Sequence, residues 1–241
     1  MAVYGSRAKI GLIVPAPGCA LEMECNEMAP EGVAIVTTRI PLEKATPEFL
    51  IKIASYIDGA ARLLAAAEPD VIALGCTAGS FIKGIGYDKS IIKSIEEATN
   101  ITGLTTSTAV LGALTKLRAR KISIATPYID EVNKQEKMFF EANGFNVISI
   151  EGLQLGRTSS RDMPLVEAKT MYGFVKKVYR PECDVIFISC TGLGVISIIE
   201  ELENELGKPV ITSNQATFWA ALRIAKVWDP IKGYGKLLRE S

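Results

Sequence analysis

The chain has 241 residues, of which 48% are apolar and 22% are charged, and its 27 basic and 27 acidic side chains give a net charge of zero. This balance excludes the basic surface that nucleic-acid binding requires, and no apolar run approaches the roughly 20 residues of a membrane span. Histidine is absent, which excludes Ser-His and Cys-His catalysis and most zinc sites, so proton transfer near neutral pH falls to Cys, Tyr, Lys or a carboxylate.

The first predicted element is a buried strand at residues 9–14, which ends at Pro15 and a turn of small residues that includes Gly18. The residues before it lack the apolar region and cleavage site of a signal peptide, so we expect a cytoplasmic protein. Five cysteines without a C-x-x-C spacing fit that expectation, because cytoplasmic thiols stay reduced.

A helix is predicted over residues 46–67, where Thr46 can cap and Pro47 suits the first helical position. The segment after it, residues 70–77, reads Asp-Val-Ile-Ala-Leu-Gly-Cys-Thr. Its apolar run is typical of a strand buried on both faces, as in a parallel sheet. The small residues after Cys76 suit a tight turn into a helix, so this thiol is expected beside a helix N-terminus.

The remaining elements alternate in the same way. A strand is expected at residues 121–126 and another at 184–188, which runs into Ser-Cys-Thr with Cys190 at its centre. Helices are predicted over residues 89–98, 109–117, 130–142, 164–179, 195–206 and 215–227. This alternation indicates parallel sheets.

Three landmarks recur in the same order at nearly one offset along the chain. Residues 9–15 match 121–127, Cys76-Thr77 matches Cys190-Thr191, and 104–109 matches 211–216. The repeats predict an α/β protein of two similar Rossmann-like (flavodoxin-like) parallel-sheet domains related by a pseudo-twofold duplication. We expect a first domain at residues 1–117 with Cys76 and a second at 118–241 with Cys190, the C-terminal tail being free to pack back on the first.

Both repeated cysteines are expected at the carboxyl ends of strands, where open α/β sheets bind ligands. The N–H groups and dipole of a following helix would lower the pKa of each thiol and bring the thiolate within reach at neutral pH. We therefore predict that Cys76 and Cys190 form a catalytic pair. The alternative is that each is a small buried apolar residue, as free cysteines commonly are. Cys19, Cys25 and Cys183 are expected to be non-catalytic, although Cys19 lies in the first loop and its approach to the site is left open.

Two thiols across a cleft suit chemistry at the carbon next to a carboxylate, since one can remove a proton or add to carbon while the other delivers a proton. The carboxylate would be held by N–H groups after each cysteine and by side-chain hydroxyls, for which the candidates are Thr77, Ser80, Tyr128 and Thr191. Alternatively, Thr77 caps a helix and Tyr128 is an ordinary half-buried tyrosine. The scheme needs no metal and no cofactor, and the G-x-G fragments at residues 84–86 and 192–194 lack the rest of a phosphate loop.

Several motifs resemble the aspartate/glutamate racemase superfamily. Residues 107–111, 125–133 and 233–237 are similar to arylmalonate decarboxylase, whereas 76–81, 189–191 and 214–219 are similar to maleate cis–trans isomerase. The resemblance implies that Cys190 is the proton-donating thiol, that Cys76 is a nucleophile or base, and that Tyr128 and Thr77 bind carboxylate.

Further positions follow from the resemblance. It places Leu42 and Ala45 at the small pocket for the leaving carboxylate, with Arg39 nearby, either holding a second carboxylate or simply exposed. The chain also departs from both relatives. The decarboxylase has glycine in place of Cys76, and the isomerase has asparagines in place of Gly18 and Gly152.

The sequence therefore predicts a cofactor-independent enzyme acting on a small carboxylate, either an arylmalonate-decarboxylase-like enzyme or a racemase. Catalysis would use Cys76 and Cys190, and the first loop, with Pro15 and Gly18, would contact substrate. The alternatives are a maleate cis–trans isomerase and a non-catalytic protein that binds a small anion. Neither nucleic acid nor membrane is an expected partner, and a homo-oligomer is left open.

Overall fold

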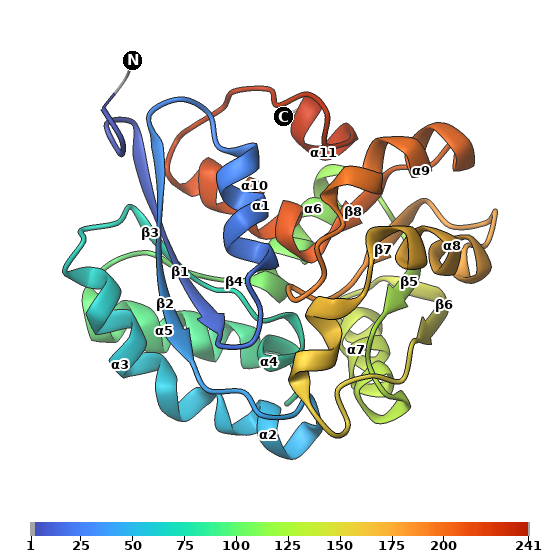
Figure 1. Cartoon of the computed structure of the whole chain (residues 1–241), viewed down its shortest axis with the longest axis horizontal. Coiled ribbons are helices and arrows are strands. Elements are labelled where there is room, and N and C mark those ends of the chain that lie inside the picture. The colour runs from blue at the N-terminus through green and yellow to red at the C-terminus, as the bar shows by residue number, and fades with distance from the viewer. Residues whose placement is uncertain (1–2, 241) are drawn as a thin grey trace.

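The computed structural model describes residues 3–240 and contains two four-stranded parallel sheets that lie side by side (Figure 1). The first sheet has the order β2-β1-β3-β4 and the second β6-β5-β7-β8, so the second repeats the order of the first. The strands are β1 (Ala8–Pro15), β2 (Val33–Ile40), β3 (Val71–Leu74), β4 (Gly103–Thr105), β5 (Lys121–Thr126), β6 (Asn146–Gly152), β7 (Val185–Ile188) and β8 (Val210–Thr212). The predicted fold class, two similar parallel-sheet α/β units, is confirmed.

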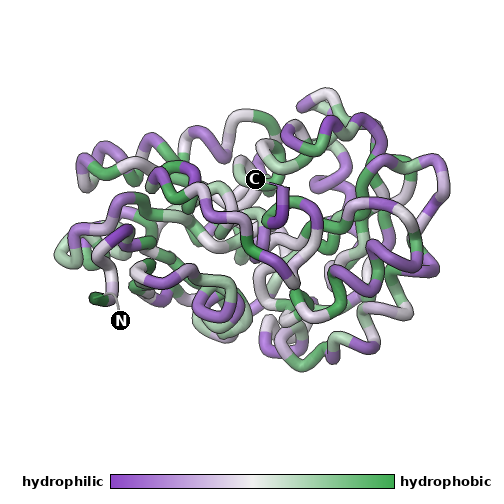
Figure 2. The backbone as a smooth tube through the Cα atoms, turned by 90° about the horizontal axis from the view of Figure 1, so that it is seen from above, coloured by the Kyte–Doolittle hydropathy of each residue, from purple (hydrophilic) through white to green (hydrophobic). Residues whose placement is uncertain are grey.

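Helices follow the strands and cover the sheets (Figure 1). They are α1 (Ala20–Met28), α2 (Pro47–Lys52), α3 (Ala54–Ala65), α4 (Thr77–Phe81), α5 (Tyr87–Thr99), α6 (Thr106–Lys116), α7 (Asp130–Ala142), α8 (Ala168–Val178), α9 (Ile199–Leu206), α10 (Ser213–Ile224) and α11 (Lys236–Arg239), with 3₁₀ turns η1 (Ser160–Leu165) and η2 (Ile196–Ile198). Viewed from above, apolar segments run through the interior and hydrophilic ones lie largely toward the outside (Figure 2).

The middle strands of each sheet form the core. All four residues of β3 and of β7 are buried, as their uninterrupted apolar runs predict. The edge strand β2 is mostly half-buried and was not recognised in the sequence. The predicted helix at 46–67 is in fact two helices that meet at Ile53, and the Thr46 side chain makes no capping hydrogen bond. The helix predicted at 164–179 starts only at Ala168, after η1.

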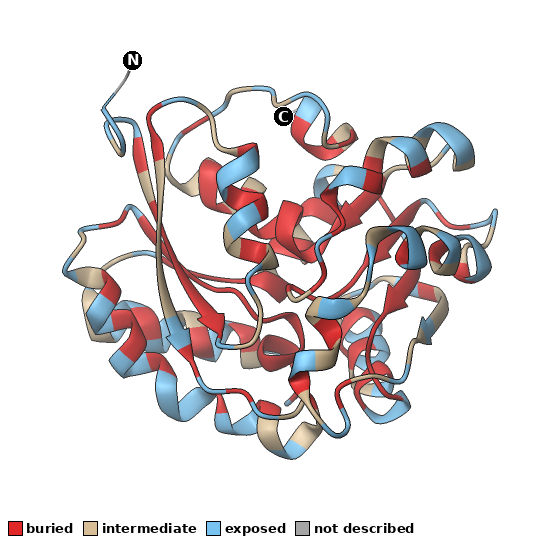
Figure 3. Cartoon of the chain, viewed as in Figure 1, coloured by how far each residue is buried: buried red, intermediate tan, exposed pale blue. Residues whose placement is uncertain are grey.

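The two halves meet through α6 and α10, whose facing sides are buried (Figure 3). Thr217 on α10 donates a hydrogen bond from its hydroxyl to Thr106 on α6, with an oxygen–oxygen distance of 3.0 Å. The side chain of Trp219 lies against Gly112, where an added Cβ would be 3.5 Å from the ring. This contact brings the carboxyl ends of both sheets to one shared region.

The C-terminal segment returns to the first half. Arg7 and Asp229 form an ion pair at 2.5 Å, and the Tyr234 hydroxyl donates to the Glu27 carboxylate at 3.1 Å. The tail thus contacts the residue that precedes β1 and helix α1, as well as α10. The division of the chain at residues 117 and 118 stays a prediction.

Candidate active site

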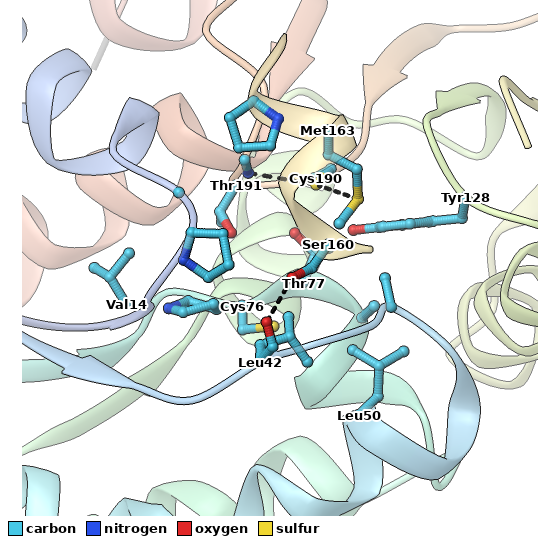
Figure 4. A pocket seen from close by; sticks show the side chains of 17 residues that line it. Val14, Leu42, Leu50, Cys76, Thr77, Tyr128, Ser160, Met163, Cys190 and Thr191 are labelled. Atoms are coloured by element: carbon cyan, nitrogen blue, oxygen red, sulfur yellow. Dashed lines mark hydrogen bonds between the residues drawn. The ribbon is translucent and has the colours of Figure 1, made fainter. Parts of the chain in front are cut away.

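A cavity lies between the two halves, at the carboxyl ends of the strands (Figure 4). It is small, with a volume of about 40 Å³. Predicted site residues from both halves line it, namely Pro15, Gly18, Cys76, Thr77, Tyr128, Cys190 and Thr191. No lining residue carries a charge. The cavity therefore has room only for a small molecule and offers neutral hydrogen-bond donors in place of a cation.

Cys76 is the residue that immediately precedes α4. Strand β3 ends at Leu74, and Cys76 keeps extended backbone angles of φ −147° and ψ 104° before the helix begins. A Cβ at Gly79 would lie 2.9 Å from the Cys76 sulfur, so the absence of a side chain there lets the first turn of α4 approach the thiol. The small residues after Cys76 are needed for this close approach, and the predicted helix N-terminus beside this thiol is present.

Cys190 has a different local structure. Its φ is +116°, a conformation that costs a non-glycine residue of the order of 1–3 kcal/mol. Its N–H donates to the Ser213 hydroxyl at 2.9 Å, and the Gly192 N–H donates to its sulfur at 3.3 Å. The expected helix does not follow directly, because the chain turns first and η2 begins only at Ile196. Loop amides therefore take the place of a helix N-terminus beside this thiol.

The two thiols come from loops on opposite sides of the cavity (Figure 4). They are 5% and 7% exposed, and they are close enough that charge on Cys190 raises the pKa of Cys76. Burial is the main cause of the shifts, raising the pKa of Cys76 to about 12 and that of Cys190 to about 11. The expected lowering of these pKa values is wrong, because the loss of water outweighs the N–H donors. Both cysteines are therefore protonated thiols at neutral pH.

Tyr128 lies beside Cys190, and its phenol is a hydrogen-bond partner that holds down the pKa of that thiol (Figure 4). The turn that carries Tyr128 is fixed by Thr126, whose hydroxyl accepts the Tyr128 N–H at 3.0 Å and donates to Asn133 at 2.6 Å. A Cβ at Gly152 would lie 2.0 Å from the Tyr128 carbonyl oxygen, so only glycine fits next to this turn. Burial raises the pKa of the Tyr128 phenol well above its usual range, which keeps it a donor at any pH near neutral.

The other hydroxyls that line the cavity already donate to protein oxygens. Thr77 donates to the Ser213 hydroxyl at 2.8 Å, Thr191 to the Gly75 carbonyl at 2.9 Å and Ser160 to the Leu42 carbonyl at 2.5 Å. Thr77 thus links the two halves and does not cap a helix. The phenol of Tyr128 remains as the side-chain donor available to a carboxylate, together with backbone N–H groups.

The structure corrects the expectation for Ser80, which does not line the cavity. Ser80 is fully buried beneath it, where its hydroxyl donates to the Thr77 carbonyl at 2.9 Å and lies 2.7 Å from the Ser107 hydroxyl. This serine supports the loop of Cys76 from inside the protein, so a substrate has no access to it.

Two loops cover the cavity, one after β2 and one after β6. The Ala45 N–H donates to the Gly156 carbonyl at 2.9 Å, and the Ser160 N–H donates to the Glu43 carbonyl at 2.8 Å. Met163 contacts the Cys190 sulfur at 3.8 Å. Sequence reasoning missed Ser160, Met163 and Pro164. The duplicated strand order could have pointed to them, because their loop follows β6 as the loop of Leu42 and Ala45 follows β2.

The remaining candidates lie elsewhere or have other partners. Cys19 is exposed, while Cys25 and Cys183 are buried, and none of the three lines the cavity. Arg39 pairs with Glu22 and donates to the Gly18 carbonyl, so its charge is already partnered. Leu42 and Ala45 do line the cavity.

Residues 3–240 contain no group of three or more Cys, Asp or Glu side chains that could hold a metal ion. Within the same range, every helix is too short or too polar to cross a membrane.

Comparisons with known proteins agree with this geometry. A sequence model of the arylmalonate decarboxylase family matches residues 10–238. The chain is 30% identical over 239 residues to arylmalonate decarboxylase of Bordetella bronchiseptica, which covers 98% of this chain and 98% of that protein. It is 24% identical over 243 residues to a maleate isomerase of Pseudomonas putida, with 95% of this chain and 96% of that protein covered.

Solved structures of arylmalonate decarboxylase and of maleate isomerase also match this chain. The liganded form of an arylmalonate decarboxylase mutant, with one glycine-to-cysteine and one cysteine-to-serine replacement, matches with a TM-score of 0.90 and 30% identity over 97% of this chain and all of that one. A Nocardia farcinica maleate cis–trans isomerase mutant with a covalently bound succinylcysteine intermediate has a TM-score of 0.92 at 20% identity, over 97% of this chain and 99% of that one. At that identity the second match shows a shared fold.

Proposed function

This chain belongs to the arylmalonate decarboxylase family, and we propose that it decarboxylates a small malonate-type acid without a cofactor, with Cys190 as the proton donor. The observation that carries the proposal is the state of Cys190. It is a protonated thiol, nearly buried at the wall of a largely apolar cavity, next to the Tyr128 phenol and the Gly192 N–H. A proton donor must hold its proton at working pH, and this thiol does.

The reaction balances with these groups alone. The bond between the α-carbon and one carboxylate breaks, carbon dioxide leaves, and the electron pair remains as an enediolate on the other carboxylate. The S–H of Cys190 then gives its proton to the α-carbon, and the resulting thiolate recovers a proton from solvent. The Tyr128 phenol and nearby backbone N–H groups stabilise the enediolate, a role worth about 3 kcal/mol for each well-placed donor.

The uncharged walls of the cavity favour loss of carbon dioxide. Val14, Leu42 and Ala45 are among the residues that line it, and none of the lining residues is a cation that could pair with a second carboxylate. A carboxylate held against these side chains loses its hydration, and that cost disappears when it becomes neutral carbon dioxide. The retained carboxylate belongs on the side of Tyr128, where the donors are.

Racemisation of a 2-substituted acid is a second candidate, which the presence of Cys76 in the same cavity favours. It requires one thiolate to remove the α-proton while the other thiol delivers one. With a pKa of about 12, Cys76 is a thiolate in only roughly one molecule in 10⁵ at pH 7. Any racemase rate should therefore rise about tenfold per pH unit, whereas decarboxylation through Cys190 should stay flat near neutral pH.

Maleate isomerisation has less support. A side chain at Gly152, where the isomerase has asparagine, would meet the Tyr128 carbonyl at 2.0 Å. Gly18 is different, since a Cβ there would make only ordinary contacts at 3.7 Å or more. The site thus has room for one of the two asparagines of the isomerase and no room for the other.

The test is an assay of wild type, Cys190→Ala, Cys76→Ala and the control Cys19→Ala with aryl- and alkylmalonates, maleate and enantiopure 2-substituted acids. We expect Cys190→Ala to lose every activity and Cys76→Ala to lose racemisation while it retains decarboxylation. Cys19→Ala should match wild type, because that residue is exposed outside the cavity. Decarboxylation that survives the loss of Cys190 would overturn the assignment, and saturable binding of these acids without any turnover would favour the anion-binding alternative.

A further inference from the structure

A buried carboxyl group that the proposed reaction does not use lies behind Cys190. Glu136, on α7, is fully buried. Its Oε1 accepts a hydrogen bond from the Ser189 hydroxyl at 2.6 Å, and Ser189 directly precedes Cys190 in the chain. Its Oε2 is buried with no hydrogen-bond partner. A carboxylate is rarely left in this condition, because an unpaired buried charge is costly.

No cation reaches Glu136 from the elements around it. Lys134 and Lys137 on the same helix are exposed, and Lys137 pairs with Glu141. Helix α4 carries no titratable side chain, and neither does β7 before Cys190. On the adjacent β6, Glu151 is exposed and faces Arg180 at 3.6 Å. On β5, Lys121 is exposed at the start of the strand.

The charge of Glu136 acts on two residues of the proposed site, Cys190 and Tyr128. A negative charge on Glu136 raises the pKa of Cys190 and that of Tyr128. Burial in turn raises the pKa of Glu136 to about 8, while the Ser189 hydrogen bond opposes that rise. At neutral pH the carboxyl group is thus mostly protonated and adds no charge next to the sulfur.

We propose that Glu136 is a positioning residue that controls the charge of Cys190. In its neutral form it allows the sulfur to become a thiolate when the thiol gives up its proton. In its ionised form it opposes that step through like-charge repulsion. The link to turnover rests on the proposed function, because only a reaction that passes through the Cys190 thiolate would respond to it.

Alkylation of Cys190 tests the inference without any substrate. In a Cys76→Ser background, the iodoacetamide rate at Cys190 is measured by peptide mass spectrometry between pH 7 and 10, with Glu136 or Glu136→Gln. Below pH 8 both proteins should react alike. Above pH 8 the protein with Glu136 should fall behind the Gln variant, by about tenfold for a coupling of one pKa unit.

Ser189→Ala provides a matched second variant that retains the carboxyl group. Without the hydroxyl that stabilises the carboxylate, Glu136 ionises at higher pH. The break in the alkylation profile, which is the pH above which the rate falls behind that of Glu136→Gln, should therefore move to higher pH. A purely structural role for Glu136 predicts no such movement. Parallel profiles for Glu136 and Glu136→Gln, in variants with native unfolding midpoints, would overturn the inference. If the Gln variant does not fold, an unmoved break in Ser189→Ala overturns it equally.

Turnover separates this inference from the proposed function. In an active enzyme, decarboxylation should decline above pH 8 with Glu136 and persist with Glu136→Gln. An alkylation break near pH 8 in a protein that decarboxylates nothing would support the role of Glu136 and refute the proposed reaction.

Discussion

The hydroxyl of Thr77 donates a hydrogen bond to the hydroxyl of Ser213 at 2.8 Å, and this bond joins the two halves of the protein beneath the cavity. The same Ser213 oxygen accepts the N–H of Cys190 at 2.9 Å. The reciprocal link runs from the Thr191 hydroxyl to the Gly75 carbonyl at 2.9 Å. Each cysteine loop is thus tied to the other half, so the positions of the two thiols depend on each other.

Replacement of Ser213 by alanine should weaken both stability and turnover. It leaves the Thr77 hydroxyl and the Cys190 N–H without their acceptor in a buried place, at a cost of about 1–3 kcal/mol of unfolding free energy. Because Cys190 also loses a bond that holds its unusual backbone, kcat should fall by roughly 10- to 100-fold. Urea unfolding and steady-state kinetics measure the two effects. The exposed control Ser94→Ala, which loses only a bond to the Ser90 carbonyl, should change little. Equal behaviour of both variants would contradict the role of Ser213.

Tyr128→Phe should reduce turnover with little effect on stability. The phenol is the side-chain donor that the cavity leaves available, and removal of one such donor typically lowers kcat by about 10²–10³. The ring still fills its place, so the fold should persist. Kinetics with the best malonate found, together with a thermal melt, check this, with the exposed Tyr56→Phe as control. A loss below threefold would show that backbone N–H groups alone bind the enediolate.

Glu24 should make stability fall as pH rises. Its carboxylate joins the halves by accepting the Ile196 N–H at 2.9 Å and the Asn214 amide at 2.6 Å. Burial nevertheless raises its pKa from 4.5 to about 7. Between these two values the folded protein binds more protons than the unfolded chain, so the contribution of Glu24 is present at pH 4 and is lost as pH rises through 7.

The measurement compares wild type with Glu24→Gln by chemical denaturation at pH 5 and pH 8. The difference in unfolding free energy between the two proteins should change by up to about 3 kcal/mol in favour of the variant at the higher pH. Glu97→Gln, exposed and paired only with Lys93, should show no such change. A difference that is constant with pH would mean that Glu24 does not titrate in this range.

Gly156→Ala should open the cover of the cavity. Gly156 has φ +82°, and a Cβ there would lie 2.8 Å from the Ala45 Cβ, so the two covering loops must separate. Gly144→Ala is the matched control, since its φ is +88° but nothing lies within 4 Å. Both variants pay a backbone cost of about 1–2 kcal/mol. Only Gly156→Ala should speed alkylation of Cys190. Equal alkylation rates in the two variants would show that the loops after β2 and β6 do not restrict access to the cavity.

Much of the site was predictable from local sequence. Buried parallel strands have uninterrupted apolar runs, and the repeated Cys-Thr after two such runs placed Cys76 and Cys190 at strand ends. The family resemblance added Pro15 and Gly18 of the first loop, which also line the cavity, and the comparisons confirm the family that the motifs resemble. These features depend on strand periodicity and on short turns, which a few neighbouring residues determine.

The protonation of the thiols and the partners of the hydroxyls were decided only by the tertiary structure. Thr77 meets Ser213 across 136 residues of sequence, and Ser160 meets Leu42 across 118. The pKa of each thiol is raised because both halves and the two covering loops exclude water from it. The sequence indicated only the backbone N–H groups that follow each cysteine, which act in the opposite direction. Desolvation sums over everything packed around a group, so no local pattern can reveal its size.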